Sequence, residues 1–156
     1  EHTLDGYTHV AVGGTFDRLH YGHRRLLTYA ISSVEPNGGI LTVGVTSDNM
    51  IKHKGNVESV GTRMDRVKDF VKRLSPGTRN RVRYVVLEDS FGPLVDDDSI
   101  TALVCSSETL AGGVECNKIR QHRGLQRVKL LVAVREDEGG MSSSALRLKE
   151  EEEGIL

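Results

Sequence analysis

Five short apolar runs rich in β-branched residues alternate with stretches of helical spacing, and this alternation limits the possible folds more than any other feature. The runs are THVAV (8–12), ILTVGV (40–45), VRYVVL (82–87), ITALVC (100–105) and VKLLVAV (128–134). Most of them are continuously apolar rather than alternating in and out, which is typical of parallel strands buried on both faces. The sequence therefore predicts an α/β fold, a doubly wound five-stranded parallel sheet.

Between these runs, apolar residues recur at helical spacing. The spacing predicts helices over 22–33 and 63–74, a weaker one over 114–123, and a last helix that opens near Ser143. Turn sequences such as SPG at 75–77 separate the elements. We expect the helices to cover both faces of the sheet.

Composition restricts the organisation and the partners of the chain. Its 156 residues fit a single domain, residues 1–156. Because it begins with Glu1 rather than Met, we expect the domain to be part of a longer polypeptide. With 21 basic and 22 acidic residues, the net charge of −1 argues against a protein held to nucleic acid or to a membrane by bulk charge. The longest apolar run, at 130–134, is too short to span a bilayer. Only two cysteines occur, Cys105 and Cys116, which suits a reducing compartment, and we expect a cytoplasmic protein.

One expected strand-to-helix turn combines small residues with imidazoles: GGTFDRLHYGH at 13–23. In open parallel sheets, ligands bind beyond the carboxyl ends of the strands, where backbone amides and helix N-termini are exposed. Gly13 and Gly14 lack Cβ atoms, so a ligand can approach the main chain there, and Thr15 adds a hydroxyl. This turn favours an anionic ligand.

His20 and His23 are three residues apart at the expected start of a helix, so both rings should project from one side of its first turn. Asp17 could cap the same turn. The helix dipole disfavours added positive charge at this end, so we expect neutral imidazoles that donate hydrogen bonds. A single glycine pair or histidine is more often structural, but the combination favours a binding site.

A second candidate phosphate site lies near the end of the chain, in GGMSSSALR at 139–147. Free amides at a helix N-terminus, three serine hydroxyls and the Arg147 guanidinium would form a cradle for a triphosphate. An ordinary serine N-cap explains the same residues equally well. The chain has neither GxxxxGK[ST] nor GxGxxG, so we do not expect a P-loop or dinucleotide-binding protein.

Two basic segments follow other predicted strands. Lys52 and Lys54 come shortly after the run at 40–45 and could reach the anionic groups of two substrates as they meet. Residues 117–129 contain several basic side chains and no acid, a local excess that suits a phosphate-bearing substrate. For both segments the alternative is solvated surface charge. The basic excess at 63–83 is interrupted by acids, and we interpret most of it as surface.

Beyond these local features, the sequence resembles a known family. GTFDRLHYGH resembles the (H/T)xGH signature of the nucleotidyltransferase superfamily, with His20 in its first position. VCSSETLAGGVECNKIRQHRGL at 104–125, together with FGP at 91–93, is similar to the phosphopantetheine adenylyltransferases of the archaeal and eukaryotic branch. The resemblance extends from about residue 10 to 147. It implies a Rossmann-like nucleotidyltransferase fold and, in coenzyme A biosynthesis, the transfer of the adenylyl group of ATP to 4′-phosphopantetheine, giving dephospho-coenzyme A and pyrophosphate.

The resemblance also implies roles for individual residues. ATP binding would fall to Gly13, Gly14, Thr15, Phe16, His23, Ser142, Ser143, Ser144 and Arg147, catalysis to Thr15, His20, His23 and Lys52, and substrate binding to Thr15, Lys52, Asn117 and Arg120. Lys52 aligns better than Lys54 with the substrate lysine of the family. The acceptor phosphate would attack the α-phosphorus directly while the histidines donate to ATP phosphate oxygens. Mg²⁺ would be bound through the ATP phosphates, without metal ligands from the protein.

Two other functions are compatible with parts of the pattern. A cytidylyltransferase acting on phosphocholine, phosphoethanolamine or glycerol 3-phosphate shares nearly the same first motif. Such enzymes resemble one another in an RTxGIST element, whereas this chain reads EDEGGMSSS at 136–144. A nucleotide-binding module without catalysis is the other alternative, and the filled polar positions of the signature argue against it.

Overall fold

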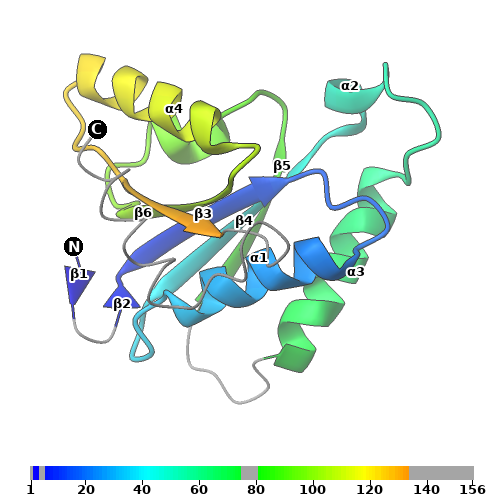
Figure 1. Ribbon diagram of the computed structural model, residues 1–156, viewed down its shortest axis with the longest axis horizontal. Helices are drawn as coiled ribbons and strands as arrows, with labels where there is room; N and C mark the ends of the chain where they lie inside the picture. The colour runs from blue at the N-terminus through cyan, green and yellow to red at the C-terminus, as the bar shows by residue number, and fades with distance from the viewer. Residues whose placement is uncertain (1, 4–5, 75–80, 134–156) are drawn as a thin grey trace.

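A computed structural model describes residues 2–3, 6–74 and 81–133. Its main sheet has five parallel strands in the order β5-β4-β3-β6-β7 (Figure 1). The strands are β3 (His9–Gly14), β4 (Ile40–Thr46), β5 (Arg81–Leu87), β6 (Ala102–Ser106) and β7 (Lys129–Ala133). All five coincide with the predicted runs, so the predicted fold class is confirmed. A small antiparallel pair, β1 (His2–Thr3) and β2 (Gly6–Tyr7), precedes them.

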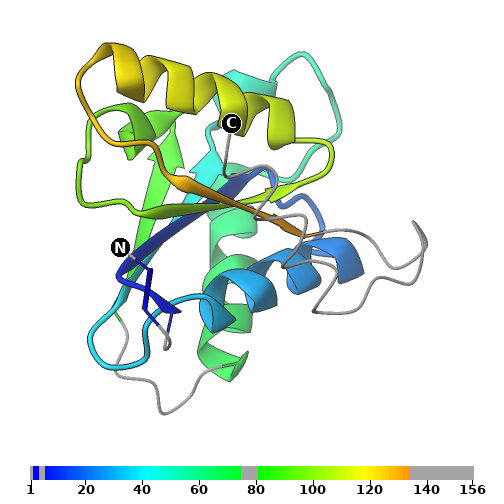
Figure 2. The same ribbon diagram turned by 60° about the vertical axis from the view of Figure 1, so that its left-hand side comes forward.

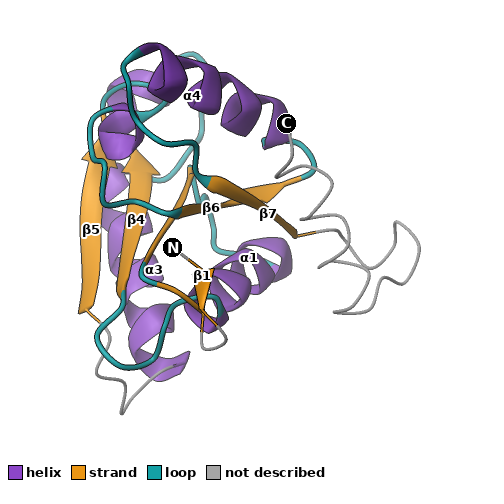
Figure 3. Ribbon diagram, turned by 90° about the vertical axis from the view of Figure 1, so that its left-hand side faces the viewer, coloured by secondary structure: helices purple, strands orange, loops and turns teal. Residues whose placement is uncertain are grey.

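The helices lie on both faces of this sheet, as Figures 2 and 3 show. The elements are α1 (Tyr21–Ser32), α2 (Asp48–Ile51), α3 (Val60–Leu74), the 3₁₀ turn η1 (Gly92–Val95) and α4 (Leu110–His122). Helices α1 and α3 cover one face, and α4 with η1 covers the other. The last predicted helix, near Ser143, lies outside the described residues, and the single domain 1–156 stays a prediction.

The larger core lies between the sheet and the pair α1 and α3. Because side chains alternate along a strand, Val10 and Val12 of β3 and Val43 and Val45 of β4 all point to this face. Each is at most 2 % exposed. The helices meet them with buried apolar side chains at helical spacing: Leu27, Ala30, Val67 and Val71. Burying one such aliphatic side chain contributes about 1.5–3 kcal/mol, which holds these helices to the sheet.

The strand order places a topological switch point between β3 and β6. The chain leaves β3 toward α1 on one face and leaves β6 toward α4 on the other face. The two connections therefore diverge at the carboxyl ends of neighbouring strands, where open α/β sheets bind their ligands. The turn at 13–23 and the loop at 106–109 flank this point.

Candidate active site

His20 and His23 form a stacked pair at the start of α1, with ring centroids 3.7 Å apart and planes inclined by 18°. His20 is the N-cap of the helix, and its Nδ1 accepts a hydrogen bond from the backbone N–H of Gly22 at 3.1 Å. The Nδ1 of His23 accepts from the backbone N–H of His20 at 3.2 Å. The two rings thus make a capping box in which imidazoles replace the usual hydroxyl and carboxylate.

This arrangement decides which ring nitrogen carries the proton. A nitrogen that accepts a hydrogen bond carries none, so each neutral ring holds its proton on Nε2. Burial, followed by the charge of neighbouring His20, lowers the pKa of His23 to about 4, while Asp17 acts in the opposite direction. His23 is therefore neutral at ordinary pH, and both rings can present an Nε2–H donor to an anion.

Asp17 does not cap the helix, contrary to the sequence-based expectation, because His20 occupies that position. Its Oδ1 accepts from the backbone N–H of Glu58 at 2.9 Å, and its Oδ2 pairs with Arg18 at 2.6 Å. The backbone hydrogen bond from Glu58 is the main reason why the pKa of Asp17 is lowered. Asp17 thus ties the β3–α1 turn to the segment before α3.

Phe16 packs against the histidine pair through His23. It is 1 % exposed, and its ring meets the His23 ring edge-on at a centroid distance of 5.5 Å. Its φ of 54° gives the turn a left-handed backbone at this residue. A buried ring offers no surface to a nucleotide, so any contact that Phe16 makes with ATP is left to its backbone.

A cavity of about 470 Å³ opens beside this turn, between the sheet and the layer formed by α4 and η1. It includes the ends of β3 and β4 at Gly14 and Thr46 and extends below η1 and α4. The cavity exists because the side chains of β3 and β4 on this face are small, namely Ala11, Gly13, Thr42 and Gly44. Along β3 and β4, the larger side chains point to the face covered by α1 and α3 and fill the core there. The smaller side chains point to the opposite face, which stays open.

Glycines also let α4 form its wall of the cavity. Thr109, Gly112, Gly113 and Cys116 line it, at the spacing of a single helix face. A Cβ on Gly113 would lie 3.0 Å from the Sγ of Cys105, so the helix packs on β6 closely at this residue. A Cβ on Gly112 would meet nothing within 4 Å. Gly112 therefore leaves room at the rim of the cavity.

Thr15 follows the last residue of β3 and lies next to Thr46, the last residue of β4. The hydroxyl of Thr46 donates to that of Thr15 at 3.2 Å. Lys52 is the exposed C-cap of α2, and Lys54 is exposed two residues later. Both lysines belong to the connection that leaves β4, so they follow the strand paired with β3. That Lys52 rather than Lys54 contacts a substrate stays a prediction.

Asn117 and Arg120, predicted to bind substrate, have a different role. Asn117 is 8 % exposed, and its side-chain amide bonds both the N–H and the carbonyl of Val128, at 2.8 and 3.0 Å. Arg120 is 0 % exposed, and its guanidinium donates to four backbone carbonyls, those of Leu94, Asp97, Ile100 and Gln126. These side chains fasten α4 to η1 and to the approaches of β6 and β7, and neither lines the cavity, so the structure does not support direct contact with substrate.

Two sets of residues remain: the predicted triphosphate ligands, and an arginine that the sequence analysis did not assign to the site. Ser142, Ser143, Ser144 and Arg147, predicted to hold the triphosphate, lie outside the described residues. Arg63, which we interpreted with its basic neighbours as surface, is instead 0 % exposed and bonded to the Thr15 turn. The sequence does indicate that Arg63 is buried, because it precedes the buried Val67 and Val71 by four and eight residues and so lies on the same helix face.

Within the described residues, no group of three or more His, Cys, Asp or Glu side chains could hold a metal ion. In the same part of the chain, no helix has the length and apolar character needed to cross a bilayer.

Comparison with known proteins agrees with this geometry. Residues 11–149 match the cytidylyltransferase-like family. A phosphopantetheine adenylyltransferase of Methanopyrus kandleri is 37 % identical over 97 % of this chain and 95 % of its own length. One from Pyrococcus abyssi is 36 % identical over 79 % of this chain and 76 % of its own length. A crystal structure of a protein of unknown function from Archaeoglobus fulgidus superposes with a TM-score of 0.67 and 30 % identity, covering 80 % of this chain and 87 % of that one. The chain therefore belongs to the cytidylyltransferase-like family and, within it, to the phosphopantetheine adenylyltransferases.

Proposed function

We propose that this protein transfers the adenylyl group of ATP to 4′-phosphopantetheine, giving dephospho-coenzyme A and pyrophosphate. Family membership supports the reaction type. The structural observation that carries the proposal is the stacked pair His20 and His23, with both Nε2–H donors available at the switch point, beside a cavity of about 470 Å³. An anion site and an elongated acceptor site then share the carboxyl ends of β3 and β4.

In this reaction an oxygen of the acceptor phosphate attacks the α-phosphorus of ATP. A new oxygen–phosphorus bond forms, the bond from the α-phosphorus to the bridging oxygen breaks, and pyrophosphate leaves with that electron pair. A phosphate monoester is already ionised, so little proton abstraction is needed. The protein acts mainly by positioning two anions and by stabilising charge that moves onto phosphate oxygens.

Each named residue then has one task. His20 and His23 donate from Nε2 to ATP phosphate oxygens as negative charge builds up on the leaving group. The Thr15 hydroxyl and Lys52 orient the acceptor phosphate, and Ser142, Ser143, Ser144 and Arg147 hold the triphosphate. A neutral His23, with its pKa near 4, suits a donor that must not change its charge during the reaction.

The cavity beside α4 suits the pantetheine arm of the acceptor. Its walls are mostly small and apolar, with Thr42 and Thr46 on the sheet side and Glu108, Thr109 and Glu115 on the side of α4. A flexible chain of methylene and amide groups needs such a mixture, because its amides must find polar partners once they leave water. The end of the cavity at Gly14 would take the phosphate.

We propose that Mg²⁺ is bound by the ATP phosphates, where it would neutralise part of their charge. The protein would contact the nucleotide complex through the donors named above. We also propose a cytoplasmic enzyme that binds neither nucleic acid nor membranes, in keeping with the net charge of −1 and with Cys105 and Cys116, which are both buried free thiols.

Pyrophosphate release tests the proposal. ATP and CTP are each supplied with 4′-phosphopantetheine, phosphocholine or glycerol 3-phosphate, with Mg²⁺ present and omitted. We expect release with ATP and 4′-phosphopantetheine that depends on Mg²⁺. Release with CTP and a small alcohol phosphate instead would identify a cytidylyltransferase, and nucleotide binding without release from any pair would identify a non-catalytic module.

A further inference from the structure

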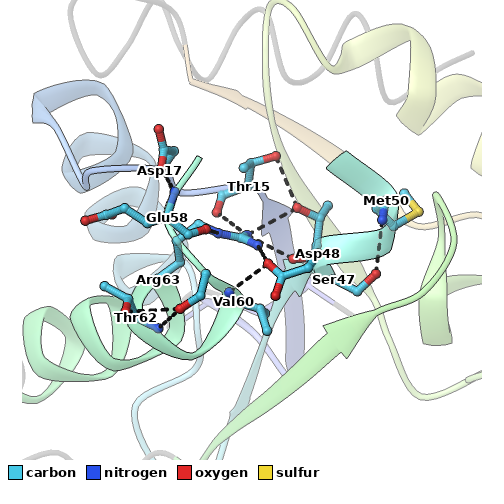
Figure 4. A network of polar contacts seen from close by, with 11 residues as sticks. Thr15, Asp17, Ser47, Asp48, Met50, Glu58, Val60, Thr62 and Arg63 are labelled. Atoms are coloured by element: carbon cyan, nitrogen blue, oxygen red, sulfur yellow. Dashed lines mark hydrogen bonds and ion pairs between the residues drawn. The ribbon is translucent and has the colours of Figure 1, made fainter. Parts of the chain in front are cut away.

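A fully buried arginine lies directly below the Thr15 turn. Arg63, in the first turn of α3, is 0 % exposed. Its Nη1 donates to the carbonyls of Thr15 and Thr46, both at 2.9 Å, at the carboxyl ends of the neighbouring strands β3 and β4. Its Nε donates to the carbonyl of Glu58 at 2.8 Å, and its Nη2 to the carboxylate of Asp48 at 3.1 Å. Figure 4 shows this guanidinium between the Thr15 turn and the α2 segment.

The guanidinium and the hydroxyls of Thr46 and Thr15 form a chain of hydrogen bonds in which each group donates to the next. Nη1 of Arg63 also approaches the Oγ1 of Thr46 at 3.4 Å, and the Thr46 hydroxyl donates to the Oγ1 of Thr15 at 3.2 Å. A guanidinium can only donate, so Thr46 accepts from it and turns its own proton toward Thr15. The Thr15 hydroxyl, already accepting, keeps its proton for a further partner. Hydrogen bonds arranged head to tail in this way strengthen one another.

Two carboxylates face the charge of Arg63. Its ion pair is with Asp48, whose side chain is 60 % exposed and therefore screened by water, Asp17 also interacts with it electrostatically, and its other hydrogen-bond acceptors are neutral. The Asp48 Oδ1 is shared with the backbone N–H of Val60 at the start of α3. The guanidinium itself is held at the carboxyl ends of β3 and β4, next to the Thr15 hydroxyl.

We propose that Arg63 is a positioning residue that, through Thr46, orients the Thr15 hydroxyl as a donor to the phosphate of the acceptor. This inference rests on the proposed function, which puts that phosphate at Thr15. Arg63 does not touch the substrate. Its effect reaches the ligand through the peptide carbonyls that it holds and through the hydroxyl chain that it polarises.

A purely structural role for Arg63 makes a different prediction. A residue that only ties the β3, β4 and α3 segments together would lower thermal stability and weaken every ligand alike. A residue that orients the Thr15 hydroxyl changes the preference for a phosphorylated acceptor over its unphosphorylated form. The ratio of the dissociation constants of the two forms measures this preference, because a change in the pantetheine site affects both constants equally.

The decisive variant is Thr46→Val, which removes the hydroxyl from the chain but keeps the side-chain shape and the carbonyl bonds of Arg63. Thr62→Val is its matched control, since Thr62 is exposed, lies next to Arg63 in α3, and its hydroxyl accepts a hydrogen bond from the nearby Ser59. Arg63→Lys keeps the charge but not the planar fork, whose three nitrogens reach Glu58, the two strand-end carbonyls and Asp48. Titration calorimetry with 4′-phosphopantetheine and with pantetheine gives the ratio for each protein.

We expect the wild type to prefer the phosphorylated ligand by at least about tenfold, as for a hydrogen bond to a charged group. Thr46→Val should reduce this preference about tenfold, and Thr62→Val should keep it. Arg63→Lys should lose the same preference, and combining it with Thr46→Val should cost nothing further, because both act through one chain. If Arg63→Lys fails to fold, Thr46→Val decides alone.

A Thr46→Val protein with the wild-type ratio overturns the inference, as does a wild type without any preference for the phosphate. Pyrophosphate release, measured in parallel, keeps the two proposals apart. A wild type that shows the preference but no turnover contradicts the proposed function and not the role of Arg63. Normal turnover with an unchanged ratio in Thr46→Val contradicts the role of Arg63 alone.

Discussion

Each histidine of the stacked pair uses its two ring nitrogens for different purposes. Nδ1 of both rings accepts a backbone N–H in the first turn of α1, which leaves Nε2 as the atom that can face a ligand. The same two side chains thus cap α1 and present the hydrogen-bond donors. An asparagine or serine would cap the helix as well but would not carry a donor to the same place.

Replacing His23 by alanine should lower kcat by a factor of about 10² to 10³, the usual effect of losing one aligned donor to a developing negative charge. Steady-state pyrophosphate release measures it, and far-UV circular dichroism checks that the variant is folded. His122→Ala, at the exposed end of α4, is the control and should keep wild-type turnover. Near-normal turnover in His23→Ala would remove His23 from the mechanism.

The lowered pKa of His23 should be visible in the stability of the protein. Between pH 6.5, the ordinary value, and about 4, the unfolded chain binds a proton at this position that the folded chain does not. The free energy of unfolding should therefore fall as the pH falls through this window, and the contribution of His23 should be complete above it. Urea titrations from pH 7 to 4 should show a smaller fall for His23→Gln, and an equal fall would contradict a half-buried imidazole that stays neutral in the folded protein.

At the scale of elements, strands were easier to predict than helix ends. Helix α4 was predicted from Val114 but begins at Leu110, because the glycine pair at 112 and 113 reads locally as a turn. Gly113 is there for close packing on Cys105, a contact with another element. Likewise α3 begins at Val60, three residues before the prediction, where its first N–H is bound by Asp48, twelve residues away. Such partners lie outside any local window.

Asn117→Ala should destabilise the protein, since both backbone groups of Val128 that Asn117 bonds would be left buried without a partner. Each such group costs about 1–3 kcal/mol. Urea unfolding measures the loss. The Michaelis constant for 4′-phosphopantetheine, measured below the melting temperature, should change little. A large rise in that constant with unchanged stability would restore Asn117 as a substrate ligand.

The rim of the cavity offers a way to close the acceptor site without disturbing the core. Gly112→Leu adds a side chain where nothing lies within 4 Å of the new Cβ, and leucine also favours helix over glycine by up to about 1 kcal/mol. Thermal stability should hold or rise, while affinity for 4′-phosphopantetheine falls and affinity for ATP persists. Unchanged acceptor affinity in calorimetry would place the acceptor elsewhere.

For the molecule as a whole, the sequence was sufficient to predict the sheet and to assign the candidate site to one of its edges. Short apolar runs rich in β-branched residues and bounded by turns are typical of buried strands, and their alternation with helices favours a parallel sheet whose loops gather at one edge. The structural roles of Arg63, Asn117 and Arg120 were missed for a common reason. In a sequence, polar side chains are expected to reach solvent or a ligand. Their partners here are mostly backbone groups of other segments, 11 to 48 residues away for the most distant partner of each.

The unequal faces of β3 and β4 have a consequence for how the protein tolerates change. Neighbouring residues of β3 and β4 point into different surroundings. Val12 and Val43 fill the core with α1 and α3, whereas Ala11 and Gly13 border the cavity. In a saturation mutagenesis of these strands scored separately for abundance and for turnover, we expect the two scores to separate with a period of two. Enlargements at Val12 and Val43 should deplete the protein, whereas modest enlargements at Ala11 should leave it abundant and inactive. Matching score profiles along the strand would mean that the open face is not a binding surface.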